Sequence, residues 1–382
     1  MRTNQRIGRR SRLATAIAVA AVAALALSGC ARDTGGGGTA QGGECERMAP
    51  PSVPAASAQP APEKPKADAS ALKVGLAYDI GGRGDASFND AAAAGLDRAV
   101  AELGLQEANT REATAQPGES EDAGTTRLRQ LAQQGFDPVI AVGFNYANGV
   151  GTVAKEFPQT RFAIVDDDTV DLPNVTPLVF AEEQGSFLVG VAAALKTETC
   201  QVGFVGGVES PLIQKFDAGY VQGATAVAPD IQVDSDYISP AGDFSGFNDA
   251  TRGTEIASGQ YDSGSDISFA AAGQSNQGIF AAAQTAGARA IGVDSDQYNS
   301  PQLTDVRDVI MTSMIKRVDV AVYNYVNAVA GNTVDQLPER FDLRNDGVGY
   351  STSGGFVDDI RPQLEAYKAA IMAGEIQVSS TK

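Results

Sequence analysis

The sequence predicts an α/β protein of two successive lobes, each a parallel sheet flanked by helices. From Leu72 onward, short apolar runs of strand length alternate with helical stretches, and this alternation is typical of a parallel, doubly wound domain. The alternation occurs twice, before and after a helix-like stretch from Glu183 to Leu195. A chain of 382 residues also has room for about two domains of roughly 150 residues each.

The expected elements follow in order along each lobe. The first series comprises strand 73–78, helix 88–103, strand 139–142, helix 146–156 and strand 162–165. The second comprises strands near 202–205, 232–238, 267–271, 290–293 and 309–312. We assign residues 72–180 to lobe 1, with a returning segment at about 316–335, and residues 181–315 to lobe 2, with a C-terminal segment at about 336–382.

Residues that suit a binding crevice follow most of these strands. In open α/β sheets, ligands bind outside the carboxyl ends of the strands. Gly and Asp are also good turn formers, so each position alone favours a plain turn. The set as a whole shifts the balance toward a ligand crevice, and it comprises Asp79, Gly143, Asp166, Gly206, Gly273 and Asp294.

The composition excludes several function classes. The chain has no His, so it has neither a Ser-His-Asp triad nor an imidazole metal site. Its formal charge of −18 argues against nucleic acid, because binders of a phosphate backbone need basic surfaces. Its 43% hydrophobic and 20% charged residues are typical of a globular protein.

The N-terminus has the pattern of a lipoprotein signal peptide. Five arginines and no acid precede an apolar run from Ala14 to Leu27 that is too short for the roughly 20 residues of a membrane-spanning helix, although an anchor remains the alternative. Leu27-Ser28-Gly29-Cys30 matches a lipobox, so we expect cleavage after residue 29 and lipidation of Cys30. Arg9-Arg10 leaves the twin-arginine route open beside the general one. Removing 1–29 deletes the five arginines and moves the formal charge from −18 to −23.

Residues 30–71 are rich in Gly, Pro, Ala and Ser and predict a disordered tether. The tether contains Cys45, and the folded part contains Cys200. An exported protein permits these two cysteines to pair, but sequence supplies no distance, so a disulfide and two free thiols both stay open.

The glycine-rich connection from Tyr78 to Asp90 lacks the glycine spacing and the Lys-Ser or Lys-Thr of a phosphate cradle. Ser87 is suited to cap the following helix. Asp79 at a strand end and Phe88 at a helix start would offer a hydrogen-bond acceptor and a stacking face, although Phe88 taken alone is better explained as a core residue.

No metal site is predicted. The segment Asp294-Ser295-Asp296 begins like a calcium loop, but Tyr298 and Asn299 replace the oxygen ligand and the glycine that such a loop requires. The acidic run Asp166-Asp167-Asp168 is better explained as a solvated strand end.

An ordered set of segments makes the chain resemble a known family. After the segment 78–90 come 143–148, 162–166, 202–207, 215–220, 246–249, 291–297 and 311–319. Together they resemble the basic membrane protein family of bacterial lipoproteins, the purine nucleoside receptors among the solute-binding components of ABC transporters. The resemblance covers about residues 72–360.

This resemblance implies a two-lobed fold of the type I periplasmic-binding-protein kind, with a hinge between the lobes and a nucleoside in the cleft. Carried over by motif, Phe88 and Phe247 would stack on the base, Asp79 would bond its edge, and Asp294 and Lys316 would hold the ribose. Asn89, beside Phe88, is a further expected ligand residue. Gly273 would allow close backbone approach. Asn148 stands where many relatives carry an acid, so we include it as a ligand residue whose effect on ligand identity stays open.

The resulting expectation is a lipid-anchored receptor on the outer face of the cell membrane, a monomer that hands a purine nucleoside to an ABC permease and its ATPase. No cofactor, metal, catalytic residue or nucleic-acid partner is expected, and the membrane is reached only through the N-terminal lipid. An acidic cleft favours a neutral, hydroxyl-rich ligand over a phosphate. The alternatives are a receptor for another neutral sugar-like or heterocyclic solute, a nucleoside hydrolase, and a sensing lipoprotein without a transport role.

Overall fold

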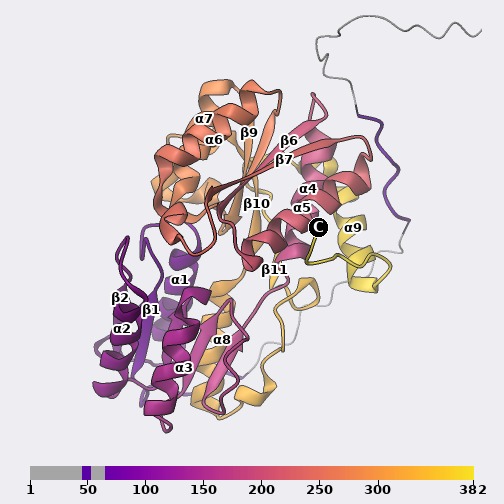
Figure 1. Cartoon of the computed structure of the whole chain (residues 1–382). Helices are drawn as coiled ribbons and strands as arrows, with labels where there is room; N and C mark the ends of the chain where they lie inside the picture. Colours follow the sequence, from indigo (N-terminus) through magenta and orange to yellow (C-terminus); the bar gives the residue numbers. More distant parts are fainter. Residues whose placement is uncertain (1–44, 53–64) are drawn as a thin grey trace, which may run out of the picture. The chain divides into compact units, whose positions relative to one another are not determined.

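A computed structural model of the chain describes residues 45–52 and 65–382 (Figure 1). Its first sheet has five parallel strands in the order β2-β1-β3-β4-β5. The strands are β1 (Val74–Tyr78), β2 (Thr110–Thr114), β3 (Val139–Val142), β4 (Phe162–Val165) and β5 (Val175–Leu178). Strands β1, β3 and β4 are buried along their whole length, which explains their continuous apolar sequences.

The helices of this sheet are α1 (Phe88–Glu102), α2 (Glu121–Gln133) and α3 (Ala147–Glu156). A later helix, α8 (Val318–Gly331), returns to pack against α1, as Figure 1 shows by its late colour among early ones. We call the first sheet with these four helices the first lobe.

The second sheet has six strands in the order β11-β10-β9-β8-β6-β7. They are β6 (Gln201–Val208), β7 (Gln232–Ser239), β8 (Ile267–Ala271), β9 (Arg289–Asp294), β10 (Ile310–Lys316) and β11 (Val348–Tyr350). All pair in parallel except β11, which runs antiparallel to β10. Its helices are α4 (Glu182–Lys196), α5 (Pro211–Val227), α6 (Ala250–Asp262), α7 (Asn276–Ala286) and α9 (Arg361–Ala373), and together they form the second lobe.

The predicted α/β class with two mainly parallel sheets is confirmed. Three strands were not predicted, namely β2, β5 and β11, and each lies at the edge of its sheet. Edge strands pair with a neighbour on one side only and are often short or charged, as in the half-exposed Thr-Arg-Glu-Ala-Thr of β2. Pro177 within β5 is likewise tolerated at an edge.

Helices α4 and α5 pack unusually close together in the second lobe. A Cβ atom on Gly219 would lie 2.2 Å from the Glu183 carbonyl oxygen, and one on Gly223 would lie 2.0 Å from the Phe187 carbonyl oxygen. Only glycine permits this approach. The contact fixes the start of α4 beside α5, where both helices reach the carboxyl ends of the strands.

The stretches 45–52 and 65–71, which we assigned to the tether, contact the folded body. Cys45 forms a disulfide with Cys200, with Cα atoms 5.1 Å apart, so the pairing that the sequence left open is present. The Arg47 guanidinium donates to the carbonyl oxygens of Ala194 and Thr197 at the end of α4. The composition of this region indicates that it cannot form a core of its own, but composition gives no information about a covalent crosslink or about backbone hydrogen bonds to the folded body.

The second of these stretches is held by the first lobe. The Ala67 backbone donates to the Asn327 side chain on α8, and the Ala69 backbone donates to the Leu103 carbonyl oxygen after α1. The expected signal peptide and the lipidation site Cys30 lie outside the described residues. Within 45–52 and 65–382, the structure contains no helix with the length and hydropathy required to cross a bilayer.

Candidate functional site

A cavity of about 550 Å³, counting space that is open to solvent, lies where the carboxyl ends of strands from both lobes meet. Both sheets reverse their strand order here, at β1/β3 and at β6/β8, and such switch points are where open α/β sheets bind ligands. It is lined by residues that end a strand or lie one or two positions after it: Asp79, Gly143, Asp166, Gly273 and Asp294.

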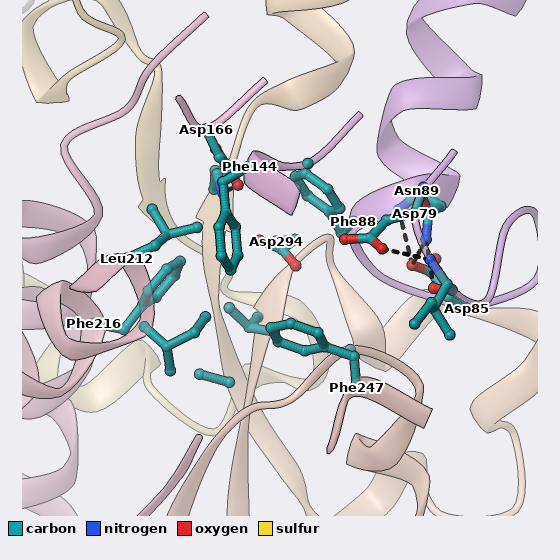
Figure 2. Close-up of a pocket in the computed structure, with 17 residues that line it drawn as sticks. Asp79, Asp85, Phe88, Asn89, Phe144, Asp166, Leu212, Phe216, Phe247 and Asp294 are labelled. Carbon is teal, nitrogen blue, oxygen red and sulfur yellow. Dashed lines mark hydrogen bonds and ion pairs between the residues drawn. The ribbon is translucent and has the colours of Figure 1, made fainter. Parts of the chain in front are cut away.

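Four phenylalanines form the apolar wall of the cavity. Phe88 and Phe144 come from the first lobe, and Phe216 and Phe247 come from the second. In Figure 2 these rings surround the open space, with Phe88 and Phe247 on opposite sides of it. The lobes also touch beside the cavity, where Phe144 meets Phe244 edge to face with centroids 5.6 Å apart. The wall therefore offers flat apolar faces from both lobes.

One side of the cavity carries Asp79 and Asn89 (Figure 2). The Asp79 carboxylate accepts from the Ile80 backbone at 2.6 Å and from the Asn145 side chain at 2.8 Å, while the Asp79 backbone donates to the Asn89 side chain at 3.0 Å. Burial raises the pKa of Asp79 to about 7, against the lowering effect of these donors. A Cβ on residue 143 would lie 2.7 Å from the Asp79 Oδ2 atom, so Gly143 is required beside this carboxylate.

Asp85 organises the loop between β1 and α1. Its carboxylate accepts from the backbone groups of Ser87, Asn89 and Asp90 and from the Asn89 side chain. Burial raises the pKa of Asp85 to about 6, against these backbone donors. Asp85 therefore performs the capping that we predicted for Ser87. The Ser87 hydroxyl instead reaches across to the second lobe and donates to Asp294 at 2.7 Å.

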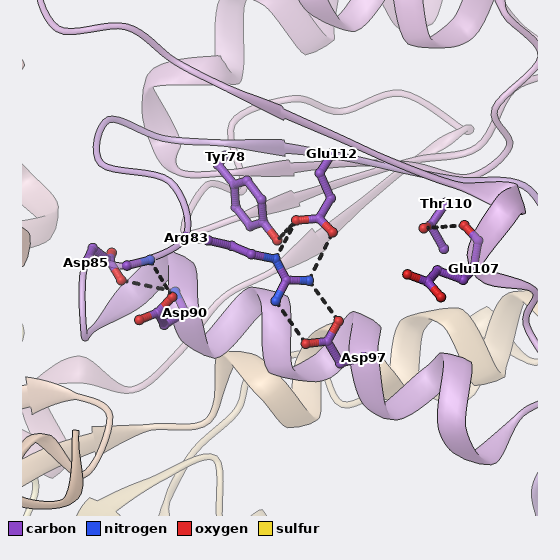
Figure 3. A network of polar contacts seen from close by, with 9 residues as sticks. Tyr78, Arg83, Asp85, Asp90, Asp97, Glu107, Thr110 and Glu112 are labelled. Carbon is purple, nitrogen blue, oxygen red and sulfur yellow. Dashed lines mark hydrogen bonds and ion pairs between the residues drawn. The ribbon is translucent and has the colours of Figure 1, made fainter. Parts of the chain in front are cut away.

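The same loop is fastened from its outer side by Arg83 (Figure 3). The Arg83 guanidinium binds both oxygens of Asp97 on α1, at 2.7 and 2.9 Å, and both oxygens of Glu112 on β2, at 2.6 and 2.9 Å. The Tyr78 hydroxyl also donates to Glu112, at 2.7 Å. Two bidentate contacts hold the backbone that presents Asp79 and the start of α1.

The other side of the cavity carries Lys316, the last residue of β10, which is 2% exposed. Its ammonium group lies 2.5 Å from Asp166 Oδ2, and it also faces the rings of Phe88 at 4.8 Å and Phe216 at 5.5 Å. Burial opposes its charge, but Asp166, Asp294 and Glu182 together raise the pKa of Lys316. Burial also raises the pKa of Asp294. The lysine is thus a fixed cation among carboxylates.

The cavity includes seven of the eight predicted ligand residues: Asp79, Phe88, Asn89, Phe247, Gly273, Asp294 and Lys316. The eighth, Asn148, lies outside the cavity. It stands in the first turn of α3, and its side chain binds Glu121 at the start of α2. The strand-to-helix turn has already carried the chain past the cavity at that point, so the corresponding wall is made by Gly143 and Phe144.

Gly206 is the other strand-end residue that lies elsewhere. Strand β6 runs on to Val208, so Gly206 lies within it, packed against Tyr237 and Ile213. Asp166 lines the cavity, as its place in the strand-end set indicated. Three further lining residues were given no ligand role from the sequence, although each lies within a segment that carried the resemblance: Asp85, Phe144 and Phe216.

The lining chemistry favours a neutral ligand with hydrogen-bond donors. Four carboxyl groups face the cavity, Asp79, Asp85, Asp166 and Asp294, against the single ammonium group of Lys316. Asp166 Oδ1 is buried and has no hydrogen-bond partner in the described part of the chain. Among the described residues, the only group with metal-ligand spacing is Cys45, Cys200 and Asp230, and its two cysteines are bonded to each other.

Residues 71–382 match the model of the Bmp family, described as "ABC transporter substrate-binding protein PnrA-like". The CD4+ T-cell-stimulating antigen of Listeria monocytogenes is 36% identical over 318 residues, which cover 80% of this chain and 87% of that protein. The ABC transporter nucleoside-binding protein BmpA of Lactococcus lactis is 33% identical over 327 residues, or 81% of this chain and 89% of that protein. An ABC transporter solute-binding protein of Aeropyrum pernix K1 has a similar crystal structure, with a TM-score of 0.67 and 26% identity over 81% of this chain and 94% of that chain.

Proposed function

This chain belongs to the Bmp family of PnrA-like ABC transporter substrate-binding proteins, and we propose that its cavity captures a purine nucleoside for delivery to the permease. Proteins of this kind are binding proteins rather than enzymes, and they work with permease and ATPase components. The name of the Lactococcus relative, a nucleoside-binding protein, supports the ligand class.

The observation that carries the proposal is the pair of rings from different lobes beside polar groups of opposite character. Phe88 and Phe247 flank the space with apolar faces, and a base between them would stack on both. Asp79 and Asn89 lie to the side of the Phe88 ring in Figure 2, where they would meet the polar edge of that base. A flat heterocycle with donor groups on one edge suits this arrangement.

The ribose would occupy the side that contains Asp294 and Lys316. Sugar hydroxyls both donate and accept, so they are able to satisfy a carboxylate and an ammonium group together. The unpartnered Asp166 Oδ1 adds a further acceptor there. A nucleotide would bring a phosphate dianion among four carboxyl groups and one cation, which disfavours it.

We also propose that the mature protein is a monomer anchored on the outer face of the cell membrane by a lipid on Cys30. The apolar N-terminal run and the sequence Leu27-Ser28-Gly29-Cys30 support this location.

Calorimetric titration of the ligand-stripped protein tests the ligand class. We expect inosine, guanosine or adenosine to bind with micromolar or higher affinity, ribose alone to bind far more weakly, and AMP at least a hundredfold more weakly than adenosine. Binding of ribose or another sugar without nucleoside binding would assign the cavity to a different neutral solute. Release of free base from a bound nucleoside would make the protein a hydrolase and overturn the proposal.

A further inference from the structure

Lys316 lies beside two carboxyl groups that belong to different lobes. Asp166 follows β4 in the first lobe, and its Oδ2 atom is 2.5 Å from the Lys316 Nζ atom. Glu182 is the first residue of α4 in the second lobe, and its Oε1 atom is 4.0 Å from the same nitrogen. Lys316 itself ends β10 of the second lobe. The close ion pair of Lys316 with Asp166 therefore joins the two lobes, whereas the more distant Glu182 belongs to the same lobe as Lys316.

Both acids are exposed to solvent by less than a tenth, and Glu182 carries an unusual deficit. Neither oxygen of the Glu182 carboxyl group has a hydrogen-bond partner among the described residues, although the side chain is only 1% exposed. Buried polar groups are nearly always hydrogen-bonded in native proteins. The charged groups that face Glu182 are Lys316 from β10, Asp166 from the end of β4, and Lys215 from α5, whose Nζ atom is 3.7 Å away.

The position of Glu182 relative to the segments that join the lobes makes this deficit informative. Residues 179–181 lead from β5 into α4, and they pair with the crossing segment near Phe341 through the Val179 and Ala181 backbones. Lys316 precedes the single residue that separates β10 from α8. Lys316 and Glu182 therefore lie at two of the places where the chain passes between the lobes.

Two-lobed binding proteins admit and release their ligands by hinge motion between the lobes. When the lobes separate, Asp166 must leave Lys316. Of the rings around the ammonium group, Phe88 leaves with the first lobe. Phe216 stays on α5, and Phe180, whose ring lies at 5.2 Å, stays in the segment 179–181 that leads from β5 into α4. The ammonium group would then lose its nearest carboxylate, which is costly for a buried charge, and the carboxyl groups left near it would be those of Asp294 and Glu182 in the second lobe.

We propose that Glu182 is a positioning residue that takes over the Lys316 ammonium group from Asp166 when the lobes separate. A shift of roughly 1 Å brings a nitrogen at 4.0 Å to hydrogen-bond distance, and the four-carbon stem of lysine permits it. Opening then exchanges one ion pair for another. The inference depends on the two-lobed fold and not on the identity of the ligand.

The exchange predicts opposite effects for the two acids. Glu182→Gln removes the ionic partner of the open state and should favour the closed state. Asp166→Asn removes the partner of the closed state and should favour the open one. Glu183→Gln is the matched control, because Glu183 is the next residue in the same first turn, is equally buried, and pairs with Arg340 instead.

Distances between spin labels in the ligand-free protein measure the open and closed populations. The exposed positions Gln133, on α2, and Ala286, on α7, suit labelling after Gln133→Cys and Ala286→Cys, in a background of Cys30→Ser that leaves the disulfide intact. Molecules whose label-to-label distance matches this structure, in which Lys316 pairs with Asp166, are counted as closed. We expect Glu182→Gln to lower the open-to-closed ratio at least fivefold, Asp166→Asn to raise it at least fivefold, and Glu183→Gln to change it less than twofold.

The conservative variant Glu182→Asp, with a shorter reach, should give an intermediate ratio, and it also serves if Glu182→Gln does not fold. An unchanged ratio in the Glu182 variants, or a shift in the same direction for Glu182→Gln and Asp166→Asn, would overturn the proposal. Because no nucleoside is present in this experiment, its failure is distinguishable from failure of the proposed ligand class.

Discussion

Phe247→Ala offers the sharpest test of the stacking role. Phe247 is half-buried in the 3₁₀ segment Phe244–Asn248, and its ring lies against Gly207 on one side and the cavity on the other. Base–aromatic stacking contributes about 1–3 kcal/mol per base, and about 1.4 kcal/mol corresponds to a tenfold change in Kd. Removing one of two stacking faces should therefore weaken inosine binding by roughly 5- to 140-fold, and Phe88→Ala should do the same.

The control is Phe244→Ala, three residues earlier in the same segment. Phe244 packs against Phe144 at the lobe contact but does not line the cavity, so its loss should change the inosine Kd less than threefold. Titration calorimetry measures all three variants, and thermal unfolding checks that each is folded. An inosine Kd within threefold of wild type for Phe247→Ala, or an equal loss for Phe244→Ala, would refute the reasoning.

Three further predictions concern buried charge and the crosslink. Because the pKa of Asp79 is raised to about 7, the folded protein holds an extra proton between about pH 4 and 7, and the stability that this proton contributes is present at low pH and lost as pH rises through 7. The free energy of unfolding of Asp79→Asn should therefore fall less than that of wild type between pH 5 and 8. Equal decreases in the two proteins would contradict the raised pKa. Lys316→Met leaves carboxylates unpaired, so urea unfolding should show a free energy of unfolding lower by about 3–5 kcal/mol. The double variant with Asp166→Asn should recover part of this loss. A double variant no more stable than Lys316→Met would argue against coupling between the two residues. Replacing Cys45 and Cys200 by Ser opens a loop of 155 residues and should cost about 2–5 kcal/mol, and an unchanged urea midpoint would show that the crosslink adds no stability.

Sequence pattern predicts the interior of this fold better than its edges. The bounds of β3, β4 and β8 are those expected, because each strand is buried on both faces and so reads as an unbroken apolar run. An edge strand such as β2 carries Arg and Glu at exposed positions, so its sequence lacks an apolar pattern that would distinguish it from a loop. Its existence depends on pairing with β1, which is a contact distant in sequence.

In the candidate site too, residues placed by a strand end are predictable from the sequence, and residues placed by a turn or by a contact distant in sequence are not. Asp79 and Asp294 are predictable because a strand end fixes their location. Asn148 does not line this cavity, because a turn of one or two residues decides whether a side chain faces the cavity or α2. The proximity of Glu182 to Lys316 joins residues 134 positions apart, and no local pattern indicates it.

The disulfide also bears on how far the folded body stands from the bilayer. If Cys30 carries the lipid, the chain is fastened to the second lobe after 15 residues, at Cys45, rather than after the 35 that lead to Pro65. At no more than about 3.6 Å per residue, the greatest separation falls from roughly 126 Å to roughly 54 Å. With a lipid on Cys30, the crosslink would thus keep the folded body within that shorter distance of the membrane surface.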